Sequence, residues 1–568
     1  MKSIEITFPK LNHFWLDSGL LGLAVILKEV NGNIQSAVTD VGLTMKGTEA
    51  EIREAMAKAY DLLIERYYDT STKKQKDDTK AYNFYYDSNE DKFIAFPKKK
   101  AVGIANLIYN KAPRPVGTSV KWEKKIKEKK VDEAWIEMKE DEKVQKGEET
   151  RKRYVLPNSH AKLQKRMDEF LDKHGLDVTT VGLLIDGPNK VQPNVNIPKK
   201  FFGETKGQCY LCGEDGISLE EAGQTIFPFI TGSSGLLNFN TLCSKPEKVC
   251  WKCAFIGKFV PVNGFYLIQG GDLFAFFPYS VSFEKMMDVY SPLQDAKYED
   301  PDLLLKNFQH PLGFEKNEGG WFQKPFEVAF AFLYTLYRKV LLHQIGEADI
   351  WEEMCNLTVS KAPLEFVVLH AESKGQTSMG KMVWQFRDSV YFFRLMEILE
   401  KSEINIKEVM RLLIDFSQKS DNKTLIRNKV CERILKKKSL LDLVESHVFS
   451  ANMTFIKPLV DFTIKYEPII REEGKPMTID AQDAAVILGK RIGMTVAENG
   501  KKGDLFALRK ARRKTDFLNE LNRLQFKCKL VVPPDVYEGQ LTDSNFVEFK
   551  QFCMIAALNS FYAATHSK

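Results

Sequence analysis

The amino-acid sequence predicts an α+β protein: a mixed α/β N-terminal domain with an inserted four-cysteine zinc module, followed by an all-α helical bundle. Three observations predict this architecture. The chain has 568 residues, too many for one compact core, and 44% of them are hydrophobic. Two Cys-x-x-Cys pairs lie near its middle. Beyond about residue 388, strand-like alternation gives way to helical periodicity.

The same observations set the predicted domain boundaries. We expect an N-terminal α/β region at 1–204, a zinc-binding module at 205–257, the remainder of the N-terminal domain at 258–387, and a helical C-terminal domain at 388–568, of which 453–568 forms a self-contained bundle.

The N-terminal region begins with the strand-like residues IEITFP. A helix is expected to begin at Asp17 or Ser18, to carry the apolar run LLGLAVIL and to end before Asn31-Gly32. The segment 121–153 changes from basic (KWEKKIKEKK) to acidic (DEAWIEMKEDEKVQKGEE) and back to basic (RKR). We interpret it as a solvated helical excursion with charge pairs, the alternative being a basic arm on a phosphate backbone.

The cysteine module carries the strongest motif. Cys209 and Cys212, followed by Gly213, form one pair, and Cys250 and Cys253 form the other. Zn²⁺ prefers four thiolates in a tetrahedron, and two such turns supply them and leave no open position. The sequence therefore predicts a structural zinc site. The 37 residues between the pairs exceed the spacing of a compact zinc ribbon, so an insert is expected there, and Cys243 within it is a fifth candidate thiol.

Two further stretches, 265–283 and 364–373, are expected to form strands of the same larger domain. Between them the run VAFAFLYTLY (328–337) predicts a buried helix, because ten residues are too few to cross a bilayer, which needs about 20. The N-terminus lacks the pattern of a secretory signal, and the nine cysteines suit a reducing compartment. We therefore expect a soluble, cytoplasmic protein without membrane contact.

The C-terminal domain, 388–568, is predicted to be almost wholly helical. The helical segments are YFFRLMEILE, IKEVMRLLIDF, TLIRNKVCERILKKKSLLDLVESHVF, IKPLVDFTIKYEPII, DAQDAAVILGKRIG, DLFALRKARRKTDFLNELNRLQFK and NFVEFKQFCMIAALNSFYAA.

The strongest local charge lies in KKGDLFALRKARRK (501–514), where seven basic residues accompany a single acid, although the whole chain carries a net charge of only +6. Asp504 is expected to cap this helix, and Leu505, Leu508, Ala511, Leu518 and Leu521 recur at helical spacing as its buried stripe. Arg509, Lys510, Arg512 and Arg513 then lie on the exposed face. They could bind phosphates, or form an ordinary solvated surface.

One stretch has the pattern of a nucleotide site. GQTSMGKM (375–382) has the spacing of a phosphate-binding loop between a strand and a helix, but Met382 stands where such a loop needs Ser or Thr to hold Mg²⁺. A polar loop that approaches nucleic acid through Lys374 and Lys381 is the alternative, as is an ordinary surface loop. The histidines are solitary and no catalytic motif is found, so we expect no enzymatic activity.

In layout, with the CYLC and CWKC pairs in mid-chain and a helical back end with a basic segment, the chain resembles the large subunit of type I CRISPR effector complexes (Cascade), most nearly the CXXC–CXXC family of subtypes I-A and I-B. The longer linker and Cys243 depart from that pattern.

The resemblance implies a nonenzymatic role in antiviral defence. Such a subunit sits at the 5′ end of the CRISPR RNA, beside the handle-binding subunit and near the backbone and small subunits. It reads the protospacer-adjacent motif on double-stranded DNA, promotes unwinding and R-loop formation, and the complex recruits a helicase–nuclease.

By this resemblance Arg509, Arg512 and Arg513, with Lys510, are the candidate strand contacts. Loop residues with donors and acceptors for base edges are the candidate motif readers: Asn31, Asn33, Gln35, Ser233, Asn238 and Asn240. In several such systems the small subunit arises from an internal start in the large-subunit message. Met453, or alternatively Met410, is the candidate start here.

Two other classes of function remain open from the sequence: a zinc-containing enzyme that uses nucleotide at 375–382, and a zinc-stabilised scaffold that binds only proteins.

Overall fold

We analysed a computed structural model of the chain. It describes residues 3–30, 34–67, 84–88, 90–95, 135–146, 149–178, 182–185, 197–221, 248–269, 272–287, 322–343, 365–374, 377–387, 389–419, 422–450, 453, 455–471 and 477–566. The chain divides into two compact units. The N-terminal unit comprises Met1–Gly264, Val281–Asp288 and Ala371–Lys381, and the C-terminal unit comprises Phe265–Ser280, Val289–His370 and Met382–Lys568.

The N-terminal unit opens with a three-stranded antiparallel sheet in the order β1-β3-β2. Its elements are β1 (Ile4–Pro9), α1 (Phe14–Glu29), β2 (Gln35–Thr39), β3 (Gly42–Gly47) and α2 (Glu49–Tyr67). The alternating residues Ile6 and Phe8 of β1 are buried, as the period of a half-buried strand requires.

Helix α1 begins at Phe14, earlier than the sequence indicated. Asp17 is not its N-cap. The carboxylate of Asp17 accepts a hydrogen bond from the backbone N–H of Leu11 at 2.9 Å and forms an ion pair with Lys10 at 3.1 Å. Asp17 therefore fixes the connection between β1 and α1 from inside the first helical turn.

A second part of the N-terminal unit has its own small core. It contains β4 (Phe84–Asp87), β5 (Lys92–Ala95), β6 (Trp135–Glu137), β7 (Lys139–Lys146), β8 (Glu149–Val155), α6 (Ala161–His174) and β9 (Gly182–Leu184). Phe84, Phe93, Met167 and Leu183 are among the residues that form this core.

The prediction of a helical charged segment at 121–153 is wrong for its described part, from residue 135 onward, whose elements are strands. Strands β7 and β8 pair antiparallel, and their register places Glu142 opposite Arg153 and Lys146 opposite Glu149. The same register places Lys143 opposite Lys152, so the charges of the two strands do not match throughout.

A four-stranded sheet has the order β12-β13-β14-β15 and is formed by β12 (Phe265–Gln269), β13 (Asp272–Tyr279), β14 (Glu365–Lys374) and β15 (Thr377–Phe386). It belongs to the C-terminal unit except for Ala371–Lys381. Both expected stretches, 265–283 and 364–373, contain strands, but β12, β13 and most of β14 belong to the C-terminal unit and not to the N-terminal domain that the sequence predicted. Helix α11 (Pro325–His343) contains the predicted buried run, and Phe332 of α11 stacks on Phe276 at 4.0 Å. The sheet thus shares one core with the helices that follow.

The structure corrects the context of the 375–382 motif. Thr377–Phe386 is strand β15, so Gly380 and Lys381 lie within a strand, and no helix follows the glycines directly. The strand–loop–helix arrangement that cradles phosphate is therefore absent from this described segment.

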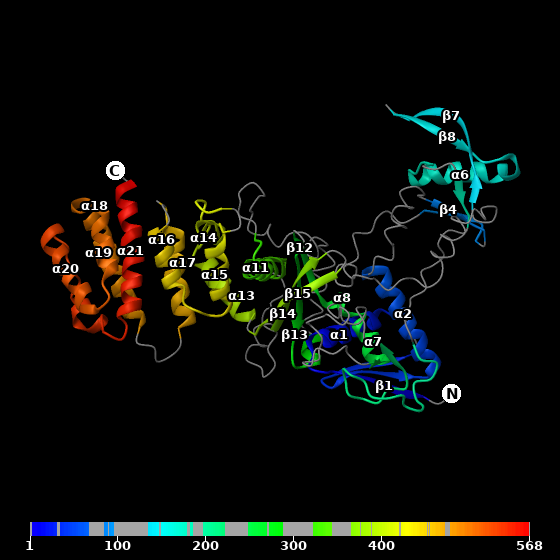
Figure 1. Ribbon diagram of the computed structural model, residues 1–568, viewed down its shortest axis with the longest axis horizontal. Helices are drawn as coiled ribbons and strands as arrows, with labels where there is room; N and C mark the ends of the chain where they lie inside the picture. Colours follow the sequence, from blue (N-terminus) through cyan, green and yellow to red (C-terminus); the bar gives the residue numbers. More distant parts are fainter. Residues whose placement is uncertain are drawn as a thin grey trace. The chain divides into compact units, whose positions relative to one another are not determined.

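The described residues from Ser389 onward are mainly helical, as the sequence predicted. The helices are α13 (Ser389–Lys401), α14 (Ile406–Leu412), α15 (Leu425–Leu435), α16 (Leu441–Ser450), α17 (Lys457–Ile470), α18 (Ile479–Asn499), α19 (Lys502–Lys510), α20 (Lys514–Cys528) and α21 (Phe546–His566), with a short π-helical turn at Val536–Gln540. Helices α18 and α19 pack against α21, and α20 packs against α18 and α19 (Figure 1).

Helices α18 and α21 approach closely because of two glycines. A Cβ added at Gly489 would lie 2.2 Å from the carbonyl oxygen of Cys553, and one at Gly493 would lie 2.2 Å from that of Ala557. The expected continuous helix over 504–527 is instead two helices, α19 and α20, separated at 511–513. None of the helices in the described part of the chain combines the length and hydropathy needed to cross a bilayer.

Candidate metal centre and cationic surface

The structure brings the four predicted cysteines together. The Sγ atoms of Cys209, Cys212, Cys250 and Cys253 all lie within 4.8 Å of one another, and those of Cys212 and Cys250 are 3.8 Å apart. A tetrahedron with metal–sulfur distances near 2.3 Å separates its sulfurs by about 3.8 Å. The four cysteines are free thiols rather than disulfides. The donor set and its spacing therefore fit a metal ion.

The first cysteine pair lies on a tight turn after Gln208. The backbone N–H of Gly213 donates to the carbonyl of Cys209 at 2.9 Å, and the N–H of Cys209 donates to the carbonyl of Glu214 at 2.8 Å. Gly213 has a φ of 73°, which residues with a side chain rarely adopt. Glycine after the second cysteine thus lets the chain turn back while both sulfurs point to one side.

The second pair joins a strand to a helix. Cys250 ends β11 (Lys248–Cys250), which pairs with β10 (Leu219–Glu221), and it is the N-cap of α7 (Trp251–Gly257). Its sulfur accepts from the N–H of Cys253 at 3.5 Å, while the N–H of Cys250 donates to the sulfur of Cys209 at 3.2 Å. Backbone N–H groups that point at the sulfurs stabilise the thiolate form that a metal needs.

The electrostatics of the cluster call for a cation. The pKa of Cys209 is far below the usual thiol value, because the thiols of Cys212, Cys250 and Cys253 donate hydrogen bonds to it. The pKa of Cys253 is far above that value, because its proton is held by hydrogen bonds to Cys209, Cys212 and Cys250 and because it is buried. Metal binding would release the remaining thiol protons, because the sulfur ligands of Zn²⁺ are thiolates.

Helix α7 and the following α8 (Val260–Asn263) pack against α1 (Figure 1). A Cβ at Gly19 of α1 would lie 2.3 Å from the carbonyl oxygen of Ile256, so the two backbones touch. Trp251 packs edge-on against Phe8 at 5.8 Å. The cluster is therefore set where a metal would hold α7 in the core of this unit.

The four cysteines differ in solvent exposure. Cys209, Cys250 and Cys253 are buried, and Cys212 is half-buried. Four protein sulfurs complete a tetrahedral shell, so no position is left for water or substrate. Cys243 and the candidate readers Ser233, Asn238 and Asn240 lie outside the described residues.

The four candidate strand contacts fall into two groups. Lys510, Arg512 and Arg513 are exposed at the break between α19 and α20. Arg509 is instead tied to its own unit: its Nε donates to Glu445 at 3.0 Å, and its guanidinium lies 4.8 Å from the ring centroid of Phe449. Arg509 is thus already neutralised, whereas its three neighbours have no acid paired with them among the described residues.

The buried stripe of this segment also differs from the predicted one. Leu505, Leu508, Ala511 and Leu521 are buried, but Phe517 takes the buried position that we assigned to Leu518, because the break at 511–513 shifts the phase of α20. Asp504 lies at the third position of α19 and accepts from the backbone N–H of Lys501 at 3.0 Å.

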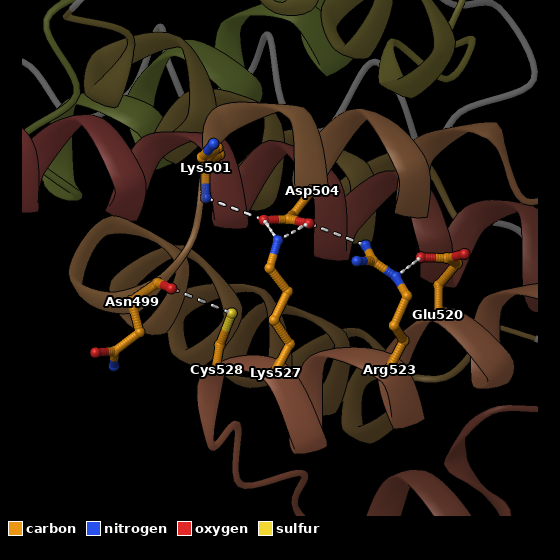
Figure 2. Close-up of polar contacts among 7 residues, drawn as sticks. All are labelled: Asn499, Lys501, Asp504, Glu520, Arg523, Lys527 and Cys528. Carbon is orange, nitrogen blue, oxygen red and sulfur yellow. Dashed lines mark hydrogen bonds and ion pairs between the residues drawn. The ribbon is translucent and has the colours of Figure 1, made fainter.

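Asp504 is also the centre of a charge network. Figure 2 shows Lys527 and Arg523 of α20 reaching this carboxylate, at 2.8 Å and 3.0 Å. Arg523 also pairs with Glu520 at 2.7 Å. The network joins the start of α19 to the end of α20, and it neutralises two cations that would otherwise add to the basic surface.

The remaining candidates are scattered. Gln35 is exposed at the start of β2. Lys381 is exposed on β15 and pairs with Glu372 at 2.6 Å. Lys374 ends β14, and its side chain is outside the described part, as are Asn31 and Asn33. The structure therefore gathers no motif-reading cluster within its described residues.

The residues that contact the break between α19 and α20 were not predicted from the sequence. Glu445 and Phe449 come from α16, and Lys550 from α21, whose Nζ donates to the carbonyls of Ala511 at 2.9 Å and Arg509 at 3.3 Å. No local sequence pattern predicts these contacts, because Glu445 is 64 residues from Arg509 and Lys550 is 39 residues from Ala511.

No protein-family model matches this sequence, and no curated protein matches it either.

Proposed function

We propose that this chain is a nonenzymatic, nucleic-acid-binding subunit, the large subunit of a type I CRISPR RNA-guided complex that works in the cytoplasm. The observation that carries the proposal is the closed four-sulfur cluster in the N-terminal unit, in a chain whose C-terminal unit contains a helical bundle with exposed cations that pair with no acid among the described residues. A closed cluster supports a role in holding structure rather than in bond breaking.

The ion of the cluster is Zn²⁺ in this proposal. Four thiolates at tetrahedral spacing suit an ion without redox chemistry or geometric preference. The ion would supply no reaction: it would tie the turn at Cys209–Cys212 to the start of α7. The protein residues do the rest, since α7 is packed on α1 and β1 by Ile256 and Trp251.

The bundle would contact DNA through Lys510, Arg512 and Arg513. Cations that have no acid to neutralise them gain most from phosphates, and their binding weakens steeply with salt. Exchange of a DNA duplex for an RNA–DNA hybrid is nearly balanced in free energy, so a few such contacts can tip it toward the open R-loop. Reading of the protospacer-adjacent motif falls to loops of the N-terminal unit, and the helicase–nuclease would act on the assembled complex.

The experiment is reconstitution of the guide-RNA complex from the backbone, handle-binding and small subunits, with and without this chain. Binding of labelled double-stranded target DNA is measured by gel shift. The proposal expects tight, motif-dependent binding only when the chain is present. Equal binding without it would refute the proposal, and so would DNA cleavage or ATP hydrolysis by the purified chain.

A further inference from the structure

The break between α19 and α20 concentrates positive charge on a short turn, residues 510–514, which we call the cationic turn. Four of its five residues are basic: Lys510, Arg512, Arg513 and Lys514. The first three are exposed and Lys514 is half-buried. Each forms no ion pair within the described residues, in contrast to Arg509, Arg523 and Lys527 nearby.

Hydrogen bonds within the bundle fix the backbone of the turn. Ala511 is buried and its N–H donates to the carbonyl of Leu508 at 3.1 Å. The ammonium of Lys550 donates to the carbonyls of Arg509 and Ala511 at the end of α19, and lies 5.6 Å from the ring centroid of Phe546. Carbonyls at a helix end need such donors, and Lys550 supplies a charged one.

The position of the turn is electrostatically unfavourable for positive charges. Arg513 is the N-cap of α20 and Lys514 its first residue, so both stand at the positive end of the helix dipole. Asp516 accepts from the backbone N–H of Arg513 at 3.2 Å, which relieves the helix end but pairs neither side chain. The described residues therefore leave these cations uncompensated, and an anion bound from outside would compensate them.

We propose that the cationic turn binds the phosphate backbone of a single nucleic-acid strand without reading bases, that Lys514 is a fourth contact beside Lys510, Arg512 and Arg513, and that Lys550 is a positioning residue that holds the turn in its binding shape. This inference rests on the proposed function and assigns its strand contact to one turn.

The chemistry of the turn favours phosphates over an acidic protein. Protein interfaces depend on buried apolar or aromatic anchors at their centre. The one apolar residue of the turn, Ala511, is buried in the bundle. The turn also lacks aromatic side chains, so it offers bases no ring to stack on, and backbone contacts dominate. Two arginines suit phosphate because the guanidinium offers paired donors to its oxygens.

The test measures binding of a labelled oligothymidylate of about 30 nucleotides, long enough to span several single-strand sites, to the full chain as a function of salt. Four phosphate contacts on a single strand give a slope of about −3 in log K against log salt, at roughly 0.7 per contact. Lys514→Ala should reduce the slope by one contact. Lys550→Met removes one charge that faces carbonyls, yet it should reduce the slope by two contacts or more and the affinity about tenfold, because the turn loses its shape.

Matched variants separate positioning from charge. Lys465→Met removes one exposed lysine of α17 and should leave the slope unchanged, and Lys550→Arg, which keeps a donor for both carbonyls, should restore binding. If Lys550→Met proves unstable by thermal melting, Ala511→Gly loosens the turn with all charges kept, and it should weaken binding several-fold.

The outcomes separate the two proposals. If the oligonucleotide binds but no substitution at 510–514 changes the slope, the cationic turn is refuted while the proposed function stands. A loss of one contact or none on Lys550→Met refutes the positioning role. Competition by polyglutamate equal to that by unlabelled oligonucleotide would show an acidic-protein site instead. If the chain binds no oligonucleotide even at low salt, both proposals fail.

Discussion

The buried ion pair between Arg427 and Glu327 gives the sharpest stability prediction. Both side chains are fully buried, and Nε of Arg427 lies 3.3 Å from Oε1 of Glu327. The guanidinium also lies 4.4 Å from the ring centroid of Phe322. The other oxygen of Glu327 accepts from the backbone N–H groups of Gln323 and Lys324, ahead of α11. This pair therefore joins α15 to the start of α11.

Removing one member of a buried pair leaves the other charge unpaired in the core, which costs about 3–5 kcal/mol. We expect Arg427→Met to lower the free energy of unfolding by that amount. Arg433→Met is the matched control, because Arg433 lies on the same helix but pairs with Asp442 near the surface. Its loss should cost about 1 kcal/mol or less.

The assay is equilibrium urea unfolding followed by far-ultraviolet circular dichroism. Adding Glu327→Gln to Arg427→Met should recover part of the loss, because no unpaired charge then remains in the core. Equal unfolding free energies for Arg427→Met and Arg433→Met would refute the reasoning.

Single contacts give three further predictions. Burial raises the pKa of Glu467 to about 6, so the fold gains about 2 kcal/mol from its protonated form below pH 4.5, and this gain is lost as pH rises through 6. Glu467→Gln should remove that pH dependence of urea unfolding, and parallel stability curves for the two proteins would contradict it. Gly489→Ala should cost about 1–3 kcal/mol in urea unfolding, because the new Cβ meets the Cys553 carbonyl at 2.2 Å. Gly503→Ala, with open space around it, should be neutral or stabilising, and similar effects of the two substitutions would argue against the close α18–α21 contact. Removal of metal with a chelator should abolish amide-exchange protection in α7 while α18 and α21 stay protected, and an unchanged α7 would count against a structural centre.

Much of the fold follows from local sequence. The run VAFAFLYTLY predicts a buried helix, which α11 confirms, and the cysteine spacing predicts a metal cluster whose four sulfurs the structure brings together. In both cases the signal lies within a few residues, as apolar periodicity or as ligand spacing with a glycine that allows the turn.

The predictions that the structure contradicts failed because they depend on contacts between residues far apart in the chain. Strands β7 and β8 carry too many charges to be recognised as strands from local sequence, and only their antiparallel pairing defines them. At the break at 511–513 the carbonyl of Ala511 accepts from Lys550, and Arg509 pairs with Glu445, both contacts between segments far apart in the chain. GQTSMGKM has the spacing of a phosphate loop, yet most of it is strand, since glycine spacing alone does not decide the fold around it.

The central claim is that four cysteine sulfurs close around one zinc ion and hold α7 in place. Native mass spectrometry of the purified chain tests it most directly, together with the Cys253→Ser variant. The account predicts one zinc ion per wild-type chain and loss of that ion in the variant. A metal-free wild-type chain with four freely alkylated thiols at Cys209, Cys212, Cys250 and Cys253 would contradict it.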